Sequence, residues 1–361
     1  MSGGEAAGCA RRCLPTMSEP AVSPVPLSVL ELATVGSGQS TAEALANTVA
    51  VAQAADRLGY TRIWVAEHHN LPAVASTNPP VLMAHLAAVT ERITVGSGGV
   101  MLPNHAPLVV AEQFALLEAL HPGRIDLGIG RAPGTDQHTA LALRRDPAAL
   151  SAEDFPKNLL DLLGLLGDER VEGGLSERFT ATPAAVTAPR VVLLGSSGFS
   201  AQLAGQLGLP FTFAHHFGGP HTQAAVALYR ESFRPSVWLE EPYTMVTANT
   251  LLADTDDEAR RLALPGQLMR LSIRTNRLRP VPSLGEAEVH PERAAAEAMP
   301  SNAIIGGPEQ AVAALRQLAA DTGADELMVS ASTHGVAERL HSLELLAAAW
   351  GLAPAGRSAA A

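Results

Sequence analysis

Lysine and cysteine are almost missing from this chain of 361 residues, and each scarcity removes a class of chemistry. Lys157 is the single lysine among 25 basic residues, and it lies in a polar stretch without the glycine-rich lead of a P-loop. A Schiff-base lysine is therefore excluded at every other position, and a P-loop lysine is excluded altogether. Both cysteines, Cys9 and Cys13, lie in the first 26 residues, so the rest of the chain has no disulfide framework, cysteine nucleophile or thiolate metal site.

Long apolar runs and an excess of positive charge are missing too. No run approaches the roughly 18 apolar residues of a membrane span, and residues 1–26 lack the apolar core of a signal peptide. We therefore expect a disordered tail over 1–26, with Met1 and Met17 as alternative starts, and a cytoplasmic protein. The net charge of −11 argues against nucleic acid or an anionic membrane as a partner.

After this tail, predicted strands and helices alternate. The strands are expected at 27–33, 61–66, 93–101, 125–130, 191–194, 211–214, 243–253 and 326–332, and a helix follows each, including one over 256–270. Strands separated so regularly by helices predict a parallel α/β sheet. Eight units over 27–352 fit a closed (β/α)₈ TIM barrel, and an open doubly wound sheet is the alternative. Residues 353–361 are expected to form a flexible tail.

Two stretches do not fit the eight units. Residues 168–189 are polar and rich in glycine and threonine, and residues 271–307 carry Arg274, Arg277 and Arg279 with weak periodicity. Segments of this length without regular structure are typically lids or disordered loops. The second is the largest insertion, and in a barrel it follows strand seven over the mouth.

Three adjacent titratable residues, Glu67, His68 and His69, directly follow the apolar second strand. Barrel enzymes build their active sites at the carboxyl ends of the strands. Because histidine titrates near neutral pH, it can move protons there, with a carboxylate beside it. The alternative is a hydrated loop that happens to contain two histidines.

Glycines mark the ends of strands three and four. Glycine weakens a strand, so Gly98 and Gly99 indicate that another group approaches the backbone closely. A flat ring lying against this backbone is one interpretation that explains the missing side chains. A bulge or barrel corner is the alternative. On strand four, Asp126, Gly128 and Gly130 share a face that we expect to open toward the mouth, where Arg131 follows.

Two groups near these strand ends suit an anion. Arg131 can hold a phosphate by a bidentate contact, and a surface salt bridge is the alternative. Ser196, Ser197 and Ser200 lie between strand five and its helix, where backbone N–H groups and hydroxyls favour an anion. An ordinary N-cap at Ser197 or Ser200 is the alternative. The glycine spacing does not fit a dinucleotide fingerprint.

The histidines also allow a second interpretation, in which they bind zinc in a hydrolase. The pairs at 68–69 and 215–216, together with Glu67, are the candidate ligands. Adjacent residues of an extended strand point to opposite faces, so at most one histidine of each pair aims inward. We therefore expect no metal site.

Three motifs together resemble the bacterial luciferase-like flavin monooxygenase family, and most closely its single-subunit, alkanal-monooxygenase-like branch. They are WVAEHHN at 64–70, VGSGGVMLP at 95–103 and PGRIDLGIGRAPG at 122–134. The resemblance extends over roughly residues 27–350. It implies a (β/α)₈ barrel that binds reduced FMN (FMNH₂) at its mouth and uses O₂ to oxidise a small organic substrate, such as an aldehyde, through a C4a-hydroperoxyflavin.

The resemblance also assigns roles to residues. His68 matches the catalytic histidine, with Glu67 or His69 orienting it. The cofactor-binding positions it implies are Gly98 and Gly99, joined by a cis peptide beneath the ring, then Val100, then Arg131 for the phosphate, and Ser196, Ser197 and Ser200 in a second phosphate loop. Gly130 stands where luciferase has a reactive cysteine, so light emission is not implied.

No separate NAD(P)H site is apparent in the sequence, so a partner flavin reductase is expected to supply the reduced flavin, and the resemblance implies a homodimer. Two other functions stay open at this point. One is an oxidoreductase of the same fold that uses the deazaflavin F420, and the other is a flavin-binding protein without catalysis.

Overall fold

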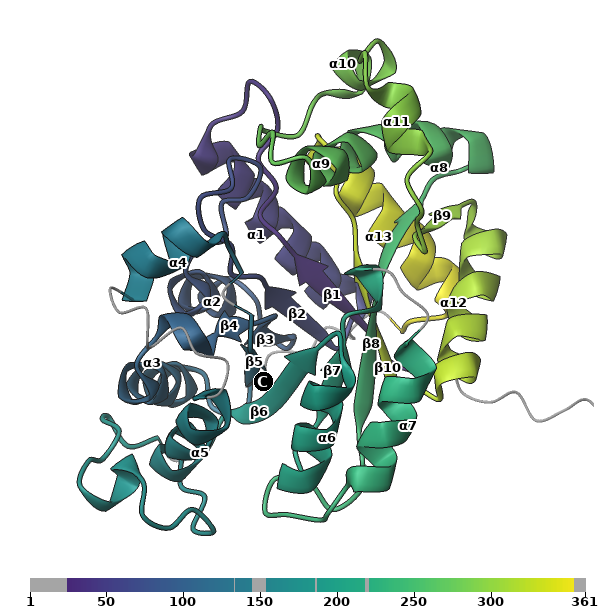
Figure 1. Ribbon diagram of the computed structural model, residues 1–361. Coiled ribbons are helices and arrows are strands. Elements are labelled where there is room, and N and C mark those ends of the chain that lie inside the picture. The colour runs from purple at the N-terminus through teal and green to yellow at the C-terminus, as the bar shows by residue number, and fades with distance from the viewer. Residues whose placement is uncertain (1–24, 133, 145–153, 186, 218–220, 354–361) are drawn as a thin grey trace, which may run out of the picture.

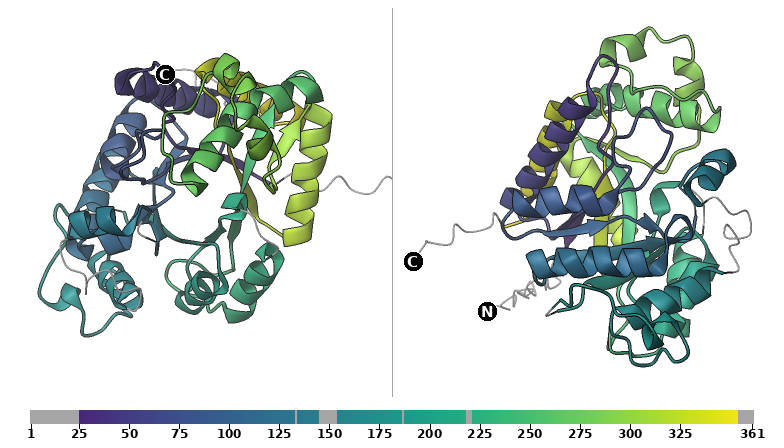
Figure 2. Two further views of the ribbon diagram at one scale, coloured as in Figure 1. Left: turned by 45° about the horizontal axis from the view of Figure 1, so that its top comes forward. Right: turned by 90° about the vertical axis from the view of Figure 1, so that its left-hand side faces the viewer.

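The computed structural model describes residues 25–132, 134–144, 154–185, 187–217 and 221–353, so most of both predicted tails lies outside the described residues. Eight parallel strand positions close into a barrel with helices around it (Figure 1; Figure 2). The strands are β1 (Leu27–Glu31), β2 (Arg62–Val65), β3 (Thr94–Ser97) continued by β4 (Val100–Met101), β5 (Ile125–Gly130), β6 (Arg190–Gly195), β7 (Phe211–Phe213), β8 (Thr244–Leu252) and β10 (Glu326–Ser330). Since β10 pairs with both β8 and β1, the sheet has closed on itself, which confirms the barrel and rules out the open sheet.

The helices that cover the barrel follow the predicted order. They are α1 (Thr41–Leu58), α2 (Pro79–Ala88), α3 (Pro107–Leu120), α5 (Phe155–Leu165), α6 (Gly198–Leu207), α7 (Thr222–Ser232), α12 (Pro308–Thr322) and α13 (Val336–Trp350). The local sequence explains where α1 begins and ends. Ser40 and Glu43 form a capping box at its start, and Gly59 ends it with a φ of 88°. A short helix, α4 (Gln137–Arg144), was not predicted.

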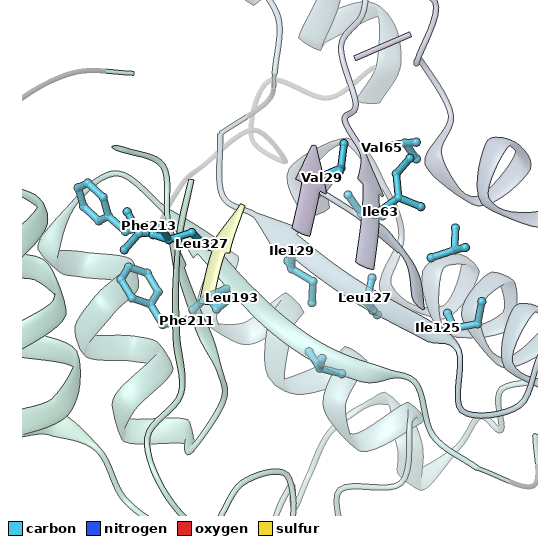
Figure 3. Packing of buried hydrophobic residues seen from close by; sticks show 14 of the residues in the cluster. Val29, Ile63, Val65, Ile125, Leu127, Ile129, Leu193, Phe211, Phe213 and Leu327 are labelled. Carbon is cyan, nitrogen blue, oxygen red and sulfur yellow. The ribbon is translucent and has the colours of Figure 1, made fainter. Parts of the chain in front are cut away.

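Strand residues alternate between two environments. Ile125, Leu127 and Ile129 share the outer face of β5 and pack into the main core between strands and helices (Figure 3). The inner faces of the other strands contribute a separate cluster that includes Leu30 and Trp64. Such alternation is expected of a strand in a barrel wall, because its side chains point in turn to the barrel interior and to the surrounding helices.

Buried charges fill the amino-terminal end of the barrel. Arg62 donates to Asp126 at 2.7 Å and to both carboxylate oxygens of Glu326 at 2.7 and 3.0 Å. Trp64 also donates to Asp126, at 2.9 Å. Each carboxylate therefore has several donors, as buried charges need.

The insertion after β8 is folded, so the prediction of an irregular segment is wrong. α8 (Asp256–Leu262) and α9 (Leu264–Arg274) lead into it, and residues 271–307 themselves contain the end of α9, α10 (Leu284–Glu288), α11 (Arg293–Glu297) and β9 (Ile304–Gly306), which pairs with β8. The single helix expected over 256–270 breaks at Ala263, because Pro265 suits the first turn of a new helix and not a helix interior. Residues 168–189 contain only a short 3₁₀ turn, Leu175–Glu177, among their described residues.

The insertion rests on the loops that follow β1 and β2. Val281 accepts a backbone hydrogen bond from Ser37 at 2.7 Å and donates one to Val35 at 2.9 Å. Its side chain is buried with Val74 and Met269. The insertion therefore lies at the carboxyl end of the barrel, as predicted. Within the described residues, the helices are either too short or too polar to cross a bilayer.

Candidate active site

The carboxyl ends of the strands bring most of the predicted site residues to one end of the barrel. Glu67, His68 and His69 follow β2, and Arg131 follows β5. Ser196 and Ser197 follow β6. Because all strands are parallel, these positions share one rim, the rim at which barrel enzymes place their chemistry.

Glu67 is the most heavily bonded residue of this rim. Its side chain is fully buried, and one carboxylate oxygen, Oε1, accepts from His69 Nε2 and His105 Nε2 at 2.9 Å each and from Asn104 Nδ2 at 3.1 Å. The other oxygen accepts from the Met101 N–H at 2.9 Å. Glu67 therefore fastens the end of β2 to the segment after β3.

The surroundings of Glu67 keep it ionised. Burial alone raises its pKa, but the hydrogen bond and charge of His105, the hydrogen bond of His69 and the Met101 N–H together outweigh burial. The pKa of Glu67 consequently lies below its usual value of 4.5. An ionised carboxylate only accepts, so both imidazoles must carry their proton on Nε2.

His68 is held by another partner than the one predicted. Its Nδ1 lies 3.3 Å from the Gly134 carbonyl oxygen, whereas no hydrogen bond joins it to Glu67 or His69 in the described part of the chain. A carbonyl only accepts, so Nδ1 carries the proton and Nε2 is left as the acceptor of the neutral ring. Glu67 acts on His68 through its charge rather than through contact.

The pKa of His68 lies below its ordinary value of 6.5. Burial is the largest cause, and the nearby charge of His69 adds to it, while the Gly134 hydrogen bond and the charge of Glu67 oppose it. His68 is therefore neutral at neutral pH and can accept a proton at Nε2.

His216 is a site residue that the sequence interpretation missed. It follows β7, and its Nδ1 is hydrogen-bonded to Thr247 Oγ1 on β8. Burial and the charges of His68 and His215 lower its pKa to about 4. The sequence suggested the pair His215–His216 as candidate metal ligands and assigned neither residue a catalytic role. Among the residues that the structure describes, no group of three or more His, Cys, Asp or Glu side chains is arranged for a metal ion.

Arg131 lies against the first turn of α6. Its guanidinium carbon is 4.4 Å from the centroid of the Phe199 ring. The alternative of a surface salt bridge is not supported, since Arg131 forms no ion pair with a carboxylate in the described ranges. A positive charge is thus positioned where the backbone N–H groups of a helix N-terminus also favour an anion.

The three serines differ in what they can contribute. Ser196 is exposed, and Ser197 occupies the N-cap position of α6, although no capping hydrogen bond of its side chain occurs among the described residues. Ser200 is buried, with its side chain against Gly195, where a Cβ would lie 2.4 Å from the Ser200 Cβ. Ser196 and Ser197 are therefore available to a ligand, and the Ser200 side chain is enclosed.

Gly98 and Gly99 interrupt the third strand position and are joined by a cis peptide bond. A Cβ on Gly98 would lie 2.7 Å from Leu30 Cδ1, and one on Gly99 would lie 2.8 Å from the Gly128 carbonyl oxygen. Packing inside the barrel therefore accounts for the missing side chains, without a ring. The Val100 side chain lies in the main core, so only its backbone can face a ligand.

The face of β5 that carries Asp126, Gly128 and Gly130 was predicted to open toward the mouth, but neighbouring strands fill the space in front of it. Asp126 bonds to Arg62 in the charged end of the barrel, and a Cβ on Gly128 would lie 2.1 Å from the Ser97 carbonyl oxygen. A Cβ on Gly130 would lie 2.6 Å from Met101 Sδ. These glycines allow neighbouring strands to pack closely, which is a structural requirement.

Comparison with known proteins shows which family the chain resembles. A family model described as luciferase-like monooxygenase matches residues 25–326. The Bacillus subtilis protein YvbT is 46% identical over 328 residues, which are 90% of this chain and 96% of YvbT. A protein of Escherichia coli K12 named luciferase-like monooxygenase is 40% identical over 331 residues, which are 89% of this chain and 96% of that protein.

Solved structures agree with this result. The crystal structure of apo-MsnO8 superposes with a TM-score of 0.82 at 36% identity, over 92% of this chain and all of that one. Two more distant structures share the fold. One is the FMN complex of the oxygenating constituent of 3,6-diketocamphane monooxygenase from Pseudomonas putida, with a TM-score of 0.67 at 20% identity, over 90% and 96% of the two chains. The other is an F420-dependent secondary alcohol dehydrogenase, with a TM-score of 0.64 at 14% identity, over 91% and 99%.

Proposed function

Because this chain belongs to the luciferase-like monooxygenase family, we propose that it is a monooxygenase that uses reduced FMN and O₂ to oxidise a small carbonyl compound. The family supports a flavin-dependent monooxygenase in general terms. The choice of FMN, the substrate class and the roles of single residues are parts of the proposal.

One observation carries the choice of a phosphorylated cofactor. Arg131 stacks on Phe199 in the first turn of α6, next to the accessible Ser196 and Ser197. A guanidinium, serine hydroxyls and the N–H groups of a helix N-terminus are the donors that a phosphate monoester needs. These residues fit the phosphate of FMN, and a surface arginine paired with a carboxylate would not.

In this proposal the backbone of Gly98, Gly99 and Val100 lines the ring, since it borders the mouth between β3 and β4. Bound reduced flavin supplies the electrons that activate O₂. His68 presents an unprotonated Nε2 at the same rim and serves as the general base. Glu67 binds His69 and the backbone N–H of Met101, and the charges of Glu67 and His69 both act on His68. We therefore assign Glu67 and His69 positioning roles.

F420 is the second candidate cofactor, because a neighbour that shares the fold is F420-dependent. F420 carries a phosphate too, so Arg131 alone does not distinguish the two. A carbonyl substrate is favoured by the diketocamphane monooxygenase neighbour, whose name describes a type II Baeyer-Villiger enzyme.

The test is an anaerobic equilibrium titration of the full chain with reduced FMN and, separately, with reduced F420, followed by admission of O₂ with a panel of aldehydes and ketones. We expect micromolar binding of reduced FMN and formation of an acid or ester that depends on oxygen. Preferential binding of F420 with hydride transfer would favour the second candidate. Tight FMN binding without any oxidised product would instead indicate a flavin-binding protein without catalysis.

Partners of this reaction are part of the same proposal. A separate flavin reductase supplies the reduced flavin, since the glycine spacing offers no dinucleotide fingerprint. A homodimer is supported by exposed apolar side chains on the neighbouring helices α2 and α3, namely Val81, Val109, Leu116 and Leu120. A cytoplasmic location is proposed because cysteines are missing from the barrel.

A further inference from the structure

Two imidazoles with the same protonation pattern border the mouth from different strands, His68 after β2 and His216 after β7. We propose that His216 is a second catalytic base, whose Nε2 takes the proton that leaves the carbonyl carbon of an aldehyde substrate as O₂ and reduced flavin oxidise it to the acid, while Thr247 holds its Nδ1–H. This inference rests on the proposed monooxygenase function, and it adds a residue that neither the motifs nor the family resemblance assigned.

The hydroxyl of Thr247 fixes the tautomer of His216. Thr247 Oγ1 lies 3.2 Å from the Phe213 carbonyl oxygen, to which it donates its only proton. The same oxygen must then accept from His216 Nδ1, because a carbonyl cannot donate. The neutral ring therefore exposes a lone pair at Nε2, which is the arrangement that also leaves His68 Nε2 unprotonated.

Several contacts hold the chain at His216 in place. Asn249 on β8 donates to the His216 carbonyl oxygen at 3.4 Å, and Asn302 of the insertion donates to the carbonyl oxygen of His215. The Phe217 ring lies 4.3 Å from the His216 ring. His216 is half-buried as a residue and is not fully enclosed by these contacts. A base held by fixed partners suits proton transfer better than a mobile one.

Electrostatics make the two histidines a pair that holds one proton at most near neutral pH. The charged groups that act on His216 are His68 and His215, and both oppose its protonation. His68 is influenced by Glu67 and His69 as well. A proton accepted by one imidazole therefore discourages a second on the other, so the proton must be passed on to solvent or product before the next turnover. His215 itself is bonded at Nδ1 to Thr222 Oγ1, at 2.7 Å.

The tautomer is tested first, by ¹⁵N NMR of the full chain labelled at histidine, with His216→Gln used to assign the signals. We expect His216 to be protonated at Nδ1 and unprotonated at Nε2 from pH 5.5 to 8. Thr247→Val should let the Nε2–H tautomer appear, and Thr247→Ser, which keeps the hydroxyl, should restore the original signals. Thr250→Val makes the same chemical change on the same strand and serves as the control. An Nε2–H tautomer in the wild type would overturn the inference.

The catalytic role is tested with reduced FMN, O₂ and the best aldehyde of the panel. We expect His216→Gln to lower kcat at least tenfold with the KM within threefold and FMN binding unchanged. We also expect Thr247→Val to lower kcat several-fold and Thr247→Ser to recover most of it. The acid limb of the wild-type pH profile should change in His216→Gln. An unchanged kcat and pH profile in His216→Gln would overturn the role of His216 alone, whereas a wild type without oxygen-dependent turnover would overturn the proposed function and this role with it.

Discussion

The guanidinium carbon of Arg131 lies 4.4 Å from the centroid of the Phe199 ring, which joins the loop after β5 to the first turn of α6. A cation over an aromatic face is attracted by the ring and is held in one orientation. This contact therefore fixes a positive charge at a helix N-terminus, on the part of the rim that we assign to the phosphate.

Replacing Arg131 by methionine should weaken the binding of reduced FMN at least tenfold. A hydrogen bond to a charged group contributes about 1.5–3 kcal/mol, which corresponds to roughly a 10- to 100-fold change in Kd. Phe199→Leu removes only the ring and should cost less than Arg131→Met. Arg178→Met changes an exposed arginine and is the control. Equal affinity in Arg131→Met and Arg178→Met would argue against the phosphate site.

Glu67→Gln should destabilise the fold by about 3 kcal/mol, because an amide cannot accept all the donors that meet at this buried carboxylate. At least one imidazole or the Met101 N–H would be left facing the amide nitrogen. Urea unfolding followed by circular dichroism measures the change, with Glu231→Gln on the exposed side of α7 as the control. A loss below 0.5 kcal/mol would show that the Glu67 network contributes little.

Stability should fall as the pH is lowered from about 6.5 to about 4. The pKa of His216 in the folded protein is about 4 and its ordinary value is 6.5, so the unfolded chain binds the proton first. Protonation therefore favours unfolding throughout this window, by roughly 3 kcal/mol at its lower end. His68, whose pKa is also lowered, acts in the same direction.

The variant His216→Gln removes one of these protons, so its unfolding free energy should depend less on pH in the same window. Chemical unfolding at intervals of half a pH unit provides the measurement. Below about pH 4.5 a separate loss begins, because the unfolded chain then protonates Glu67 first, and the contribution of Glu67 to stability is lost as the pH falls toward its lowered pKa in the folded state. Parallel pH curves for wild type and variant between 6.5 and 4 would contradict the assignment to His216.

Leu116→Glu on α3 should convert a homodimer to monomers. Leu116 is exposed, as are Val109 and Leu120 on the same helix, and a buried unpaired charge at an interface costs several kcal/mol. Light scattering after size exclusion should give twice the chain mass of 37.5 kDa for the wild type and the chain mass itself for the variant. Val237→Glu, at an exposed valine outside α2 and α3, is the control. A monomeric wild type would refute the homodimer proposal.

Much of the barrel was predictable because its signals are local. The alternation of Ile125, Leu127 and Ile129 predicts a strand face, and the capping box of Ser40 and Glu43 lies within four residues. The insertion was mispredicted because α10 and α11 have five residues each, too few to show a helical period. Such short helices depend on packing against α9 and not on their own sequence.

The network of the site was less predictable, since its contacts join residues far apart along the chain. His105 lies 38 residues from Glu67, and Thr247 lies 31 residues from His216. The adjacency of Glu67 and His68 suggested a direct bond, yet an extended chain sends neighbouring side chains to opposite sides. Only the closed barrel reveals which distant donors reach the carboxylate and which hydroxyl fixes the second imidazole.

The attachment of Val281 to the chain around Ser37 has an evolutionary consequence. This anchor is made with segments after β1 and β2, whereas Arg131 and α6 come from the β5 and β6 side of the circle. The helices of the insertion can therefore change in length above one half of the opening without disturbing the half that we assign to the cofactor phosphate. Related proteins with this barrel can in this way come to accept different substrates while the proposed phosphate site stays the same.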